Sequence, residues 1–291
     1  MITLQQLRYF KELAKTQHLT QTAERLYITQ TTLSNTIINL EKQLGVKLFD
    51  RVGRNLQLNA VGELYLKYVS EALMVLDNGL CAVNDHKEAV QKAVSVAMIN
   101  SNVWSDLIRG FHGRYQDYSI RQVTGDKNQL RNQLTEQQVD FVIAGINDFS
   151  LSGLAHEVIR VEQIYLCVPG DHRFAGKEGV WLRDTKDEAF VCLPESNSFR
   201  GFCDELFKKA GIACNAALEC DYVMREKLVA AGFGIAITTN ATRRKNTETG
   251  ITYVPVLDAF AKRPIAIIWN PKHYLSRAAV DFKAFVLETE L

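Results

Sequence analysis

The 291-residue sequence lacks several features that would place it in a specialised class of protein. Its six cysteines include no Cys-x-x-Cys pair, which argues against a paired zinc site or a dense disulfide framework and favours reduced, buried thiols. It has no apolar run near the ~18 residues that a membrane helix needs. The stretch MITLQQLRYFKEL also lacks the apolar core of a signal peptide. We therefore expect a cytoplasmic protein with no membrane partner.

Neither sign of charge is in excess over the whole chain, whose formal net charge is +1. The distribution is nevertheless uneven. Residues 1–60 hold eight Lys and Arg against four Asp and Glu, a net charge of +4, so the remainder carries −3. A basic N-terminal module on a mildly acidic body is expected when one end of a protein meets a polyanion. The length and the 47% hydrophobic content predict two or three domains with well-filled cores.

Motifs of enzymes and of metal sites are also missing. The six histidines stand alone, without the spacing of a zinc protease or the elbow motif of a serine hydrolase, and no Walker loop is present. The Gly-x-Gly in AAGFGIAI precedes a predicted strand, whereas a dinucleotide-binding fingerprint follows one. The sequence therefore predicts no catalytic residues, no metal and no cofactor.

The first 58 residues carry the pattern of a winged helix-turn-helix domain. Apolar periodicity predicts one helix, then a short second helix capped by Thr20, and after a tight turn a third helix that starts at Thr29 and ends at Gly45. The segment KLFDRVGRNLQLN then has the alternation of a β-hairpin, the wing, with Gly53 at its turn.

The third helix opens with neutral hydrogen-bonding side chains, although exposed helix positions usually carry charged ones. Base edges in the DNA major groove offer donors and acceptors that Gln, Asn, Ser and Thr can bond. Phosphate contacts position a protein and base contacts specify the sequence, so we expect this helix to read bases and two wing arginines to hold the backbone or minor groove. The alternative is a merely solvated helix face, which the basic wing and the preceding helix and turn disfavour. The predicted DNA-binding residues are Thr29, Gln30, Thr31, Ser34, Asn35, Arg51 and Arg54.

Residues 59–92 show an unbroken helical pattern that begins at Asn59, a capping residue, and exceeds a typical globular helix in length. Their apolar residues form a narrow seam, which predicts a linker helix that pairs with its own copy in a dimer.

Residues 93–291 alternate buried strands with amphipathic helices, which predicts an α/β domain of parallel sheets with helices on both faces. We expect two lobes, the first formed by residues 93–161 and 265–291 and the second by 162–264. A ligand would lie at strand ends in the crevice between the lobes. The predicted strands are 94–99, 119–125, 140–145, 164–169, 189–194, 234–238 and 264–269.

The segment TAERLYITQTTLSNTIINLEKQLGVKLFDR, followed by LQLNAVG, resembles the N-terminal signature of LysR-type transcriptional regulators. In that family Ser-Gln-x-x-x-Ser opens the recognition helix, and Leu-Glu-x-x-Leu-Gly-x-x-Leu-Phe-x-Arg and Leu-Thr-x-x-Gly follow. The match covers about 60 contiguous residues. Thr29 replaces the usual Ser, Asn59 replaces Thr, and Asn35 stands where a longer side chain is frequent. These departures keep the hydrogen-bonding class, so they point to an unusual operator sequence and not to lost DNA binding.

The resemblance implies a winged helix-turn-helix, a linker helix that pairs two chains, and a two-lobed effector domain like periplasmic binding proteins. It also implies a dimer of dimers, a homotetramer, on double-stranded DNA with an interrupted inverted repeat, and RNA polymerase is a candidate further partner. Two rival functions fit the C-terminal domain alone, namely a protein that scavenges a metabolite and an enzyme that uses the cleft. The +4 module and the neutral helix face favour a transcriptional regulator over both.

Short polar residues follow several predicted strands, where the resemblance places the effector cleft. Asn100-Ser101-Asn102 stand between a strand and a helix, and a helix N-terminus with such side chains can hold an anion, although a plain N-cap is the alternative. Arg200 is the cation best placed to pair with a carboxylate, unless it is simply a solvent-facing residue. We therefore expect a small polar or anionic effector. The predicted effector-binding residues are Asn100, Ser101, Asn102, Asn128, Asn147, Ser198, Arg200 and Thr239.

Overall fold

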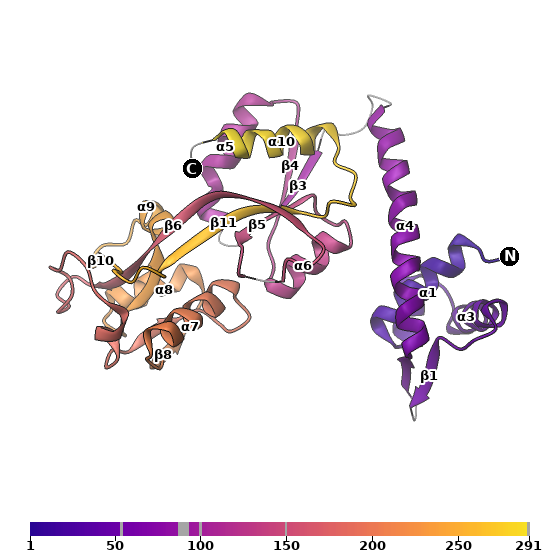
Figure 1. Cartoon of the computed structure of the whole chain (residues 1–291), viewed down its shortest axis with the longest axis horizontal. Helices are drawn as coiled ribbons and strands as arrows, with labels where there is room; N and C mark the ends of the chain where they lie inside the picture. Colours follow the sequence, from indigo (N-terminus) through magenta and orange to yellow (C-terminus); the bar gives the residue numbers. More distant parts are fainter. Residues whose placement is uncertain (53–54, 87–92, 99–100, 149, 290–291) are drawn as a thin grey trace. The chain divides into compact units, whose positions relative to one another are not determined.

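The computed structural model describes residues 1–52, 55–86, 93–98, 101–148 and 150–289 (Figure 1). The chain divides into two compact units, Met1–Glu88 and Ala89–Leu291. Among the helices of the described part, none is long and apolar enough to cross a lipid bilayer.

The N-terminal unit is a three-helix domain with a short β-hairpin. Its core is built by Phe10 and Leu13 from the first helix and by Leu33 and Leu40 from the third, all fully buried. The predicted order of elements is confirmed, but the second helix begins one residue earlier than expected. His18, not Thr20, is its N-cap, because the His18 Nδ1 accepts a hydrogen bond from the backbone N–H of Gln21. The elements are α1 (Leu4–Thr16), α2 (Leu19–Arg25), α3 (Gln30–Leu44), β1 (Phe49–Val52) and β2 (Asn55–Leu58).

Helix α4 (Ala60–His86) follows the hairpin and is the longest helix of the described chain. The Asn59 side chain accepts a hydrogen bond from the backbone N–H of Gly62 at 2.9 Å, as a capping residue does. Val69 and Leu73 face α1 and are buried, whereas a second row of apolar side chains is exposed in the single chain. This exposed row consists of Val61, Leu64, Tyr68, Val75, Leu76, Leu80 and Val83.

The first lobe of the C-terminal unit is a sheet covered by helices on both faces (Figure 1). Strand residues alternate: Val94 and Val96 pack under α5 and α10, whereas Ala97 faces α6 on the other side. The elements of this lobe are β3 (Ala93–Met98), the short 3-10 helix η1 (Ser101–Trp104), α5 (Ser105–Arg114), β4 (Ser119–Val123), α6 (Lys127–Thr135), β5 (Phe141–Gly145) and α10 (Arg277–Glu288).

The second lobe repeats this plan, with α7 and α8 on opposite faces of a smaller set of strands. Phe199, Leu206 and Phe207 of α7 fill one core, and Val229 of α8 fills the other. The elements are the 3-10 helix η2 (Leu182–Thr185), β7 (Phe190–Cys192), α7 (Ser198–Ala210), β8 (Ala216–Glu219), α8 (Tyr222–Ala230), β9 (Ala236–Thr239), α9 (Asn240–Lys245) and β10 (Ile251–Pro255).

Two long strands, β6 (Ala155–Pro169) and β11 (Lys262–Trp269), pass from one lobe into the other and pair with each other. The predicted lobe boundaries, 161/162 and 264/265, fall inside these strands. The expectation of purely parallel sheets was wrong. The β3–β4, β3–β5 and β7–β8 pairs are parallel, but β6 and β11 run antiparallel to all of their partners. A buried strand reads the same in either direction, so the sequence pattern could not reveal this.

Candidate functional site

The tip of α3 lies directly after the turn that connects it to α2. Tyr27 occupies this turn in the left-handed region, with φ +55°, and its side chain is 96% exposed. Thr29 caps α3 by accepting a hydrogen bond from the backbone N–H of Thr32 at 3.1 Å. At the other end Gly45 adopts φ +74° and donates to the Glu41 carbonyl. The third helix therefore begins and ends at the predicted residues.

One face of α3 carries the predicted DNA-binding side chains and the opposite face is core. Thr29, Gln30, Thr31 and Asn35 are exposed, and Ser34 is half-buried. Gln30 is also held by α2, because its Oε1 accepts a hydrogen bond from the Thr20 hydroxyl at 3.1 Å. The first turn of α3 contains no acidic residue. A surface of neutral donors and acceptors with a fixed orientation can approach base edges without an anion that would repel phosphates.

Glu41, which the sequence analysis did not single out, connects α3 to the wing. Its buried Oε1 accepts hydrogen bonds from the backbone N–H groups of Leu48 at 2.9 Å and Phe49 at 3.3 Å. Its Oε2 pairs with the Lys47 Nζ at 2.7 Å. The signal in the sequence is a carboxylate beside the apolar stripe of α3, where a buried charge requires partners.

The wing places one of the two predicted arginines. Arg51 is exposed on β1, paired across the hairpin with Leu56 of β2. Arg54 lies outside the described residues. The N-terminal unit thus presents the neutral tip of α3 and at least one exposed cation on the wing that follows it.

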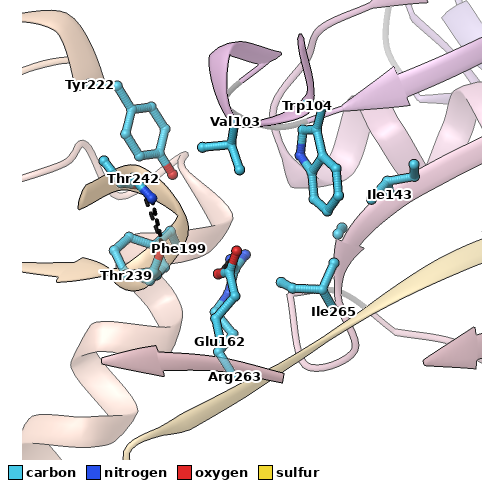
Figure 2. A pocket seen from close by; sticks show the side chains of 11 residues that line it. Val103, Trp104, Ile143, Glu162, Phe199, Tyr222, Thr239, Thr242, Arg263 and Ile265 are labelled. Atoms are coloured by element: carbon cyan, nitrogen blue, oxygen red, sulfur yellow. Dashed lines mark hydrogen bonds and ion pairs between the residues drawn. The ribbon is translucent and has the colours of Figure 1, made fainter. Parts of the chain in front are cut away.

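The C-terminal unit holds a cleft between its lobes (Figure 2). Trp104 and Ile265 line it from the first lobe, Tyr222 and Thr239 from the second, and Glu162 and Arg263 lie between them. The cavity itself is small, about 30 Å³, which is room for about two water molecules.

A larger hollow of about 330 Å³ adjoins this cavity and shares Val103 and Trp104 with it. Its wall contains the basic side chains of Arg160, Arg244 and Lys245. A hollow of this size falls in the range of small-molecule sites.

Four buried charges form a network at the floor of the cleft. Arg263 donates to Asp148 Oδ2 at 2.6 Å and to Glu162 Oε2 at 3.1 Å. Glu162 Oε1 also accepts from Arg160 at 2.5 Å. The Ser198 hydroxyl donates to the same oxygen of Asp148 at 3.0 Å, which joins the second lobe to the network.

The two arginines of this network differ in their electrostatic surroundings. Burial disfavours the charge of Arg263, but the carboxylates of Asp148 and Glu162 outweigh it and raise the pKa of Arg263. Arg160 stacks on the Trp104 ring, with 4.1 Å from its Cζ to the ring centroid. Burial, together with the charges of Arg263 and Arg244, lowers the pKa of Arg160 although Glu162 opposes this. Arg160 therefore faces more positive than negative charge on its open side.

The predicted effector-binding residues are only partly brought together. Thr239 lines the cavity, and Ser198 belongs to the charge network. Asn128 and Asn147 are exposed. Asn100 lies outside the described residues, as do the side chains of Ser101 and Asn102, whose backbone forms part of η1.

Arg200 is fully engaged within its own lobe. It donates to Asp204 and Glu219, both at 2.8 Å, and to the Leu193 carbonyl at 2.9 Å. The cation that lines the cavity is instead Arg263. Sequence reasoning missed Arg263 and Glu162 because both lie inside long strands; the available signal was a charged residue at a position where a buried strand was expected.

Metal chemistry finds no support in the described part of the chain, where no three His, Cys, Asp or Glu side chains meet in a group that could hold an ion.

Comparisons with known proteins identify both units. Residues 4–63 match the family described as "Bacterial regulatory helix-turn-helix protein, lysR family", and residues 89–290 match the family described as "LysR substrate binding domain". The uncharacterized HTH-type transcriptional regulator YybE of Bacillus subtilis is 31% identical over 288 residues, 97% of each chain. The transcriptional dual regulator GltC of the same organism is 28% identical over 98% of this chain and 96% of its own.

Solved structures show the same fold. Full-length OxyR from Pseudomonas aeruginosa aligns over 98% of this chain and 95% of its own, with a TM-score of 0.70 at 23% identity. Full-length CbnR in complex with its target DNA aligns over 98% of both chains, with a TM-score of 0.58 at 22% identity.

Proposed function

The chain belongs to the LysR family of transcriptional regulators, and from that premise we propose that α3 reads a specific DNA sequence under the control of a small polar or anionic effector. It is a DNA-binding regulator with an effector-binding domain and not an enzyme. The observation that carries the DNA-reading part of the proposal is the exposed tip of α3, which offers hydrogen-bonding groups and no charge in its first turn. Charge for the phosphates comes from the wing, at Arg51 and, from the sequence, Arg54.

The charge around the cleft supports an anionic effector. Arg160, Arg244 and Lys245 surround the larger hollow, and Asp106, which pairs with Lys245, is the acidic member of its wall. An anion between Arg160 and Arg244 would relieve the repulsion that lowers the pKa of Arg160. Trp104, Leu107 and Phe285 give the same hollow an apolar side. A carboxylate on a small carbon skeleton fits this combination.

Control requires that the effector bind one arrangement of the lobes better than another, since equal binding shifts no equilibrium. The cavity of about 30 Å³ is too small for a metabolite, so ligand entry would have to open the cleft or use the adjoining hollow. Either route alters contacts between lobes that meet at the Ser198–Asp148 hydrogen bond.

Transmission to DNA would proceed through paired linker helices. The exposed apolar row of α4 defined above is the surface that a second copy would cover, because a single chain leaves it in water. We propose two such dimers per inverted-repeat operator, assembled in the cytoplasm, with RNA polymerase as a further contact.

A thermal-shift screen of the full chain would test the effector part of this proposal. Small mono- and dicarboxylates should raise the melting temperature in a saturable way, because a ligand at 100 times its Kd stabilises the folded state by about 2.7 kcal/mol. The matched neutral amides should do so far less.

Two neighbouring arginines provide the control. Arg244→Ala should weaken the shift, whereas Arg243→Ala should not, since the Arg243 guanidinium lies over the Tyr165 ring, 5.1 Å from its centroid. Equal shifts from amides and carboxylates, or no shift from any of them, would contradict an anionic effector.

A further inference from the structure

Two cysteines of the second lobe lie in contact. The Sγ atoms of Cys192 and Cys214 are 3.6 Å apart. Cys192 ends β7, and Cys214 lies in the segment that leads into β8, the parallel partner of β7. We propose that Cys192 and Cys214 form a reversible disulfide when the protein meets a peroxide, so that the second lobe carries an oxidation-sensitive site in addition to the effector cleft.

The geometry requires little movement. A disulfide bond is about 2.05 Å long, so each sulfur has to advance by less than about 1 Å from its present position. The two segments already run side by side. Phe190 at the start of β7 donates its backbone N–H to the Asn215 carbonyl at 2.8 Å, one residue after Cys214. The backbone therefore holds the two thiols together before any oxidant arrives.

The two thiols are prepared for different roles. A hydrogen bond from the Cys214 thiol lowers the pKa of Cys192 against the opposing effect of burial, and the positive charge of Arg200 lowers it further. The hydrogen bond and burial raise the pKa of Cys214. A thiolate next to a resolving thiol is the arrangement of an oxidation-sensing cysteine pair. The other buried cysteines differ, since burial raises the pKa of both Cys167 and Cys203 to about 12.

A small oxidant could reach the reacting sulfur. A void of about 20 Å³, lined by Cys192, Cys203 and Arg200, lies beside it. This volume holds about one water-sized molecule, which admits hydrogen peroxide and excludes bulkier oxidants such as glutathione disulfide. Cys214 is half-buried, so the resolving thiol has access to solvent.

The reaction proceeds in two balanced steps. The Cys192 thiolate attacks one peroxide oxygen, an S–O bond forms, the O–O bond breaks, and hydroxide leaves and takes up a proton to become water. Cys214 then attacks the Cys192 sulfur, an S–S bond forms, and the sulfenic oxygen leaves as water with the Cys214 proton. Two sulfurs are oxidised by two electrons in total and one peroxide is reduced to two waters.

The test uses the full chain with the exposed Cys81 replaced, as Cys81→Ser, to prevent bridges between chains. The reduced protein is treated with equimolar hydrogen peroxide, alkylated, digested without reductant and mapped by mass spectrometry. We expect one Cys192–Cys214 peptide, loss of two thiols per chain, and full recovery with dithiothreitol. The Cys192 thiol should react roughly tenfold faster than those of Cys167 and Cys203.

Two variants separate this chemistry from general oxidation. Cys203→Ser should keep the bridge, because Cys203 borders the same void but takes no part in it. Cys214→Ser should leave Cys192 as a sulfenic acid that dimedone captures. The inference would be overturned if the treated protein, still folded by circular dichroism, retained both thiols, or if it bridged other cysteines equally well. Neither outcome would bear on the proposed effector, since the experiment contains none.

Discussion

Replacing Arg263 with alanine is expected to lower the free energy of unfolding of the C-terminal unit by about 3–5 kcal/mol. Arg263 is the cation between Asp148 and Glu162, and all three side chains are buried. Removing it leaves Asp148 without a cation, since Glu162 can still pair with Arg160. An uncompensated carboxylate in the interior is costly, and the protein would respond by unfolding more readily or by protonating it.

Urea denaturation of the full chain, followed by near-ultraviolet circular dichroism of the C-terminal unit, measures this loss. Arg114→Ala is the matched control because Arg114 also pairs with a carboxylate, that of Glu288, but both side chains are more than half exposed. An exposed pair contributes at most about 1 kcal/mol. If the two variants lost the same small amount, the network at the floor of the cleft would not be a structural element of this unit.

Glu41→Ala is expected to destabilise the N-terminal unit by about 2–4 kcal/mol, because it strands two backbone donors. The N–H groups of Leu48 and Phe49 both point at the Glu41 carboxylate, and all three residues are buried. The same change should weaken DNA binding, since Glu41 holds the start of the wing against α3.

Thermal unfolding of the isolated effect in Glu24→Ala provides the comparison. Glu24 is exposed on α2, so its replacement should change stability by less than about 0.5 kcal/mol. A Glu41→Ala protein as stable as the Glu24→Ala protein would mean that water replaces the carboxylate without cost and that the connection between α3 and the wing is weak.

The N-terminal unit could be predicted closely because its signals are local. Thr29 and Gly45 mark both ends of α3 through capping geometry that depends on a few neighbouring residues. Its buried stripe follows from helical spacing alone, and Leu33, Ile37 and Leu40 are all inward. The error at α2 arose because a histidine can also supply a capping acceptor.

The C-terminal unit was harder to predict because its site is assembled from distant residues. Glu162 and Arg263 are 101 positions apart and meet because β6 and β11 pair as antiparallel strands. Strand β8 and the first part of β6 were missed because they are largely exposed and show no buried run. Arg200 looked like a free cation because the carboxylates of Asp204 and Glu219 reach it only after folding.

The central claim, that the neutral tip of α3 reads bases, is tested most directly by selecting duplexes from a random pool with the full chain and with two variants. Gln30→Ala should lose discrimination at one or two base positions, about 1–3 kcal/mol each, and keep its affinity for unrelated duplexes. Arg51→Ala should bind all duplexes more weakly, keep the selected sequence, and show a salt dependence that is shallower by about one counterion. A Gln30→Ala protein that selects the unchanged sequence with uniformly lower affinity would contradict the claim.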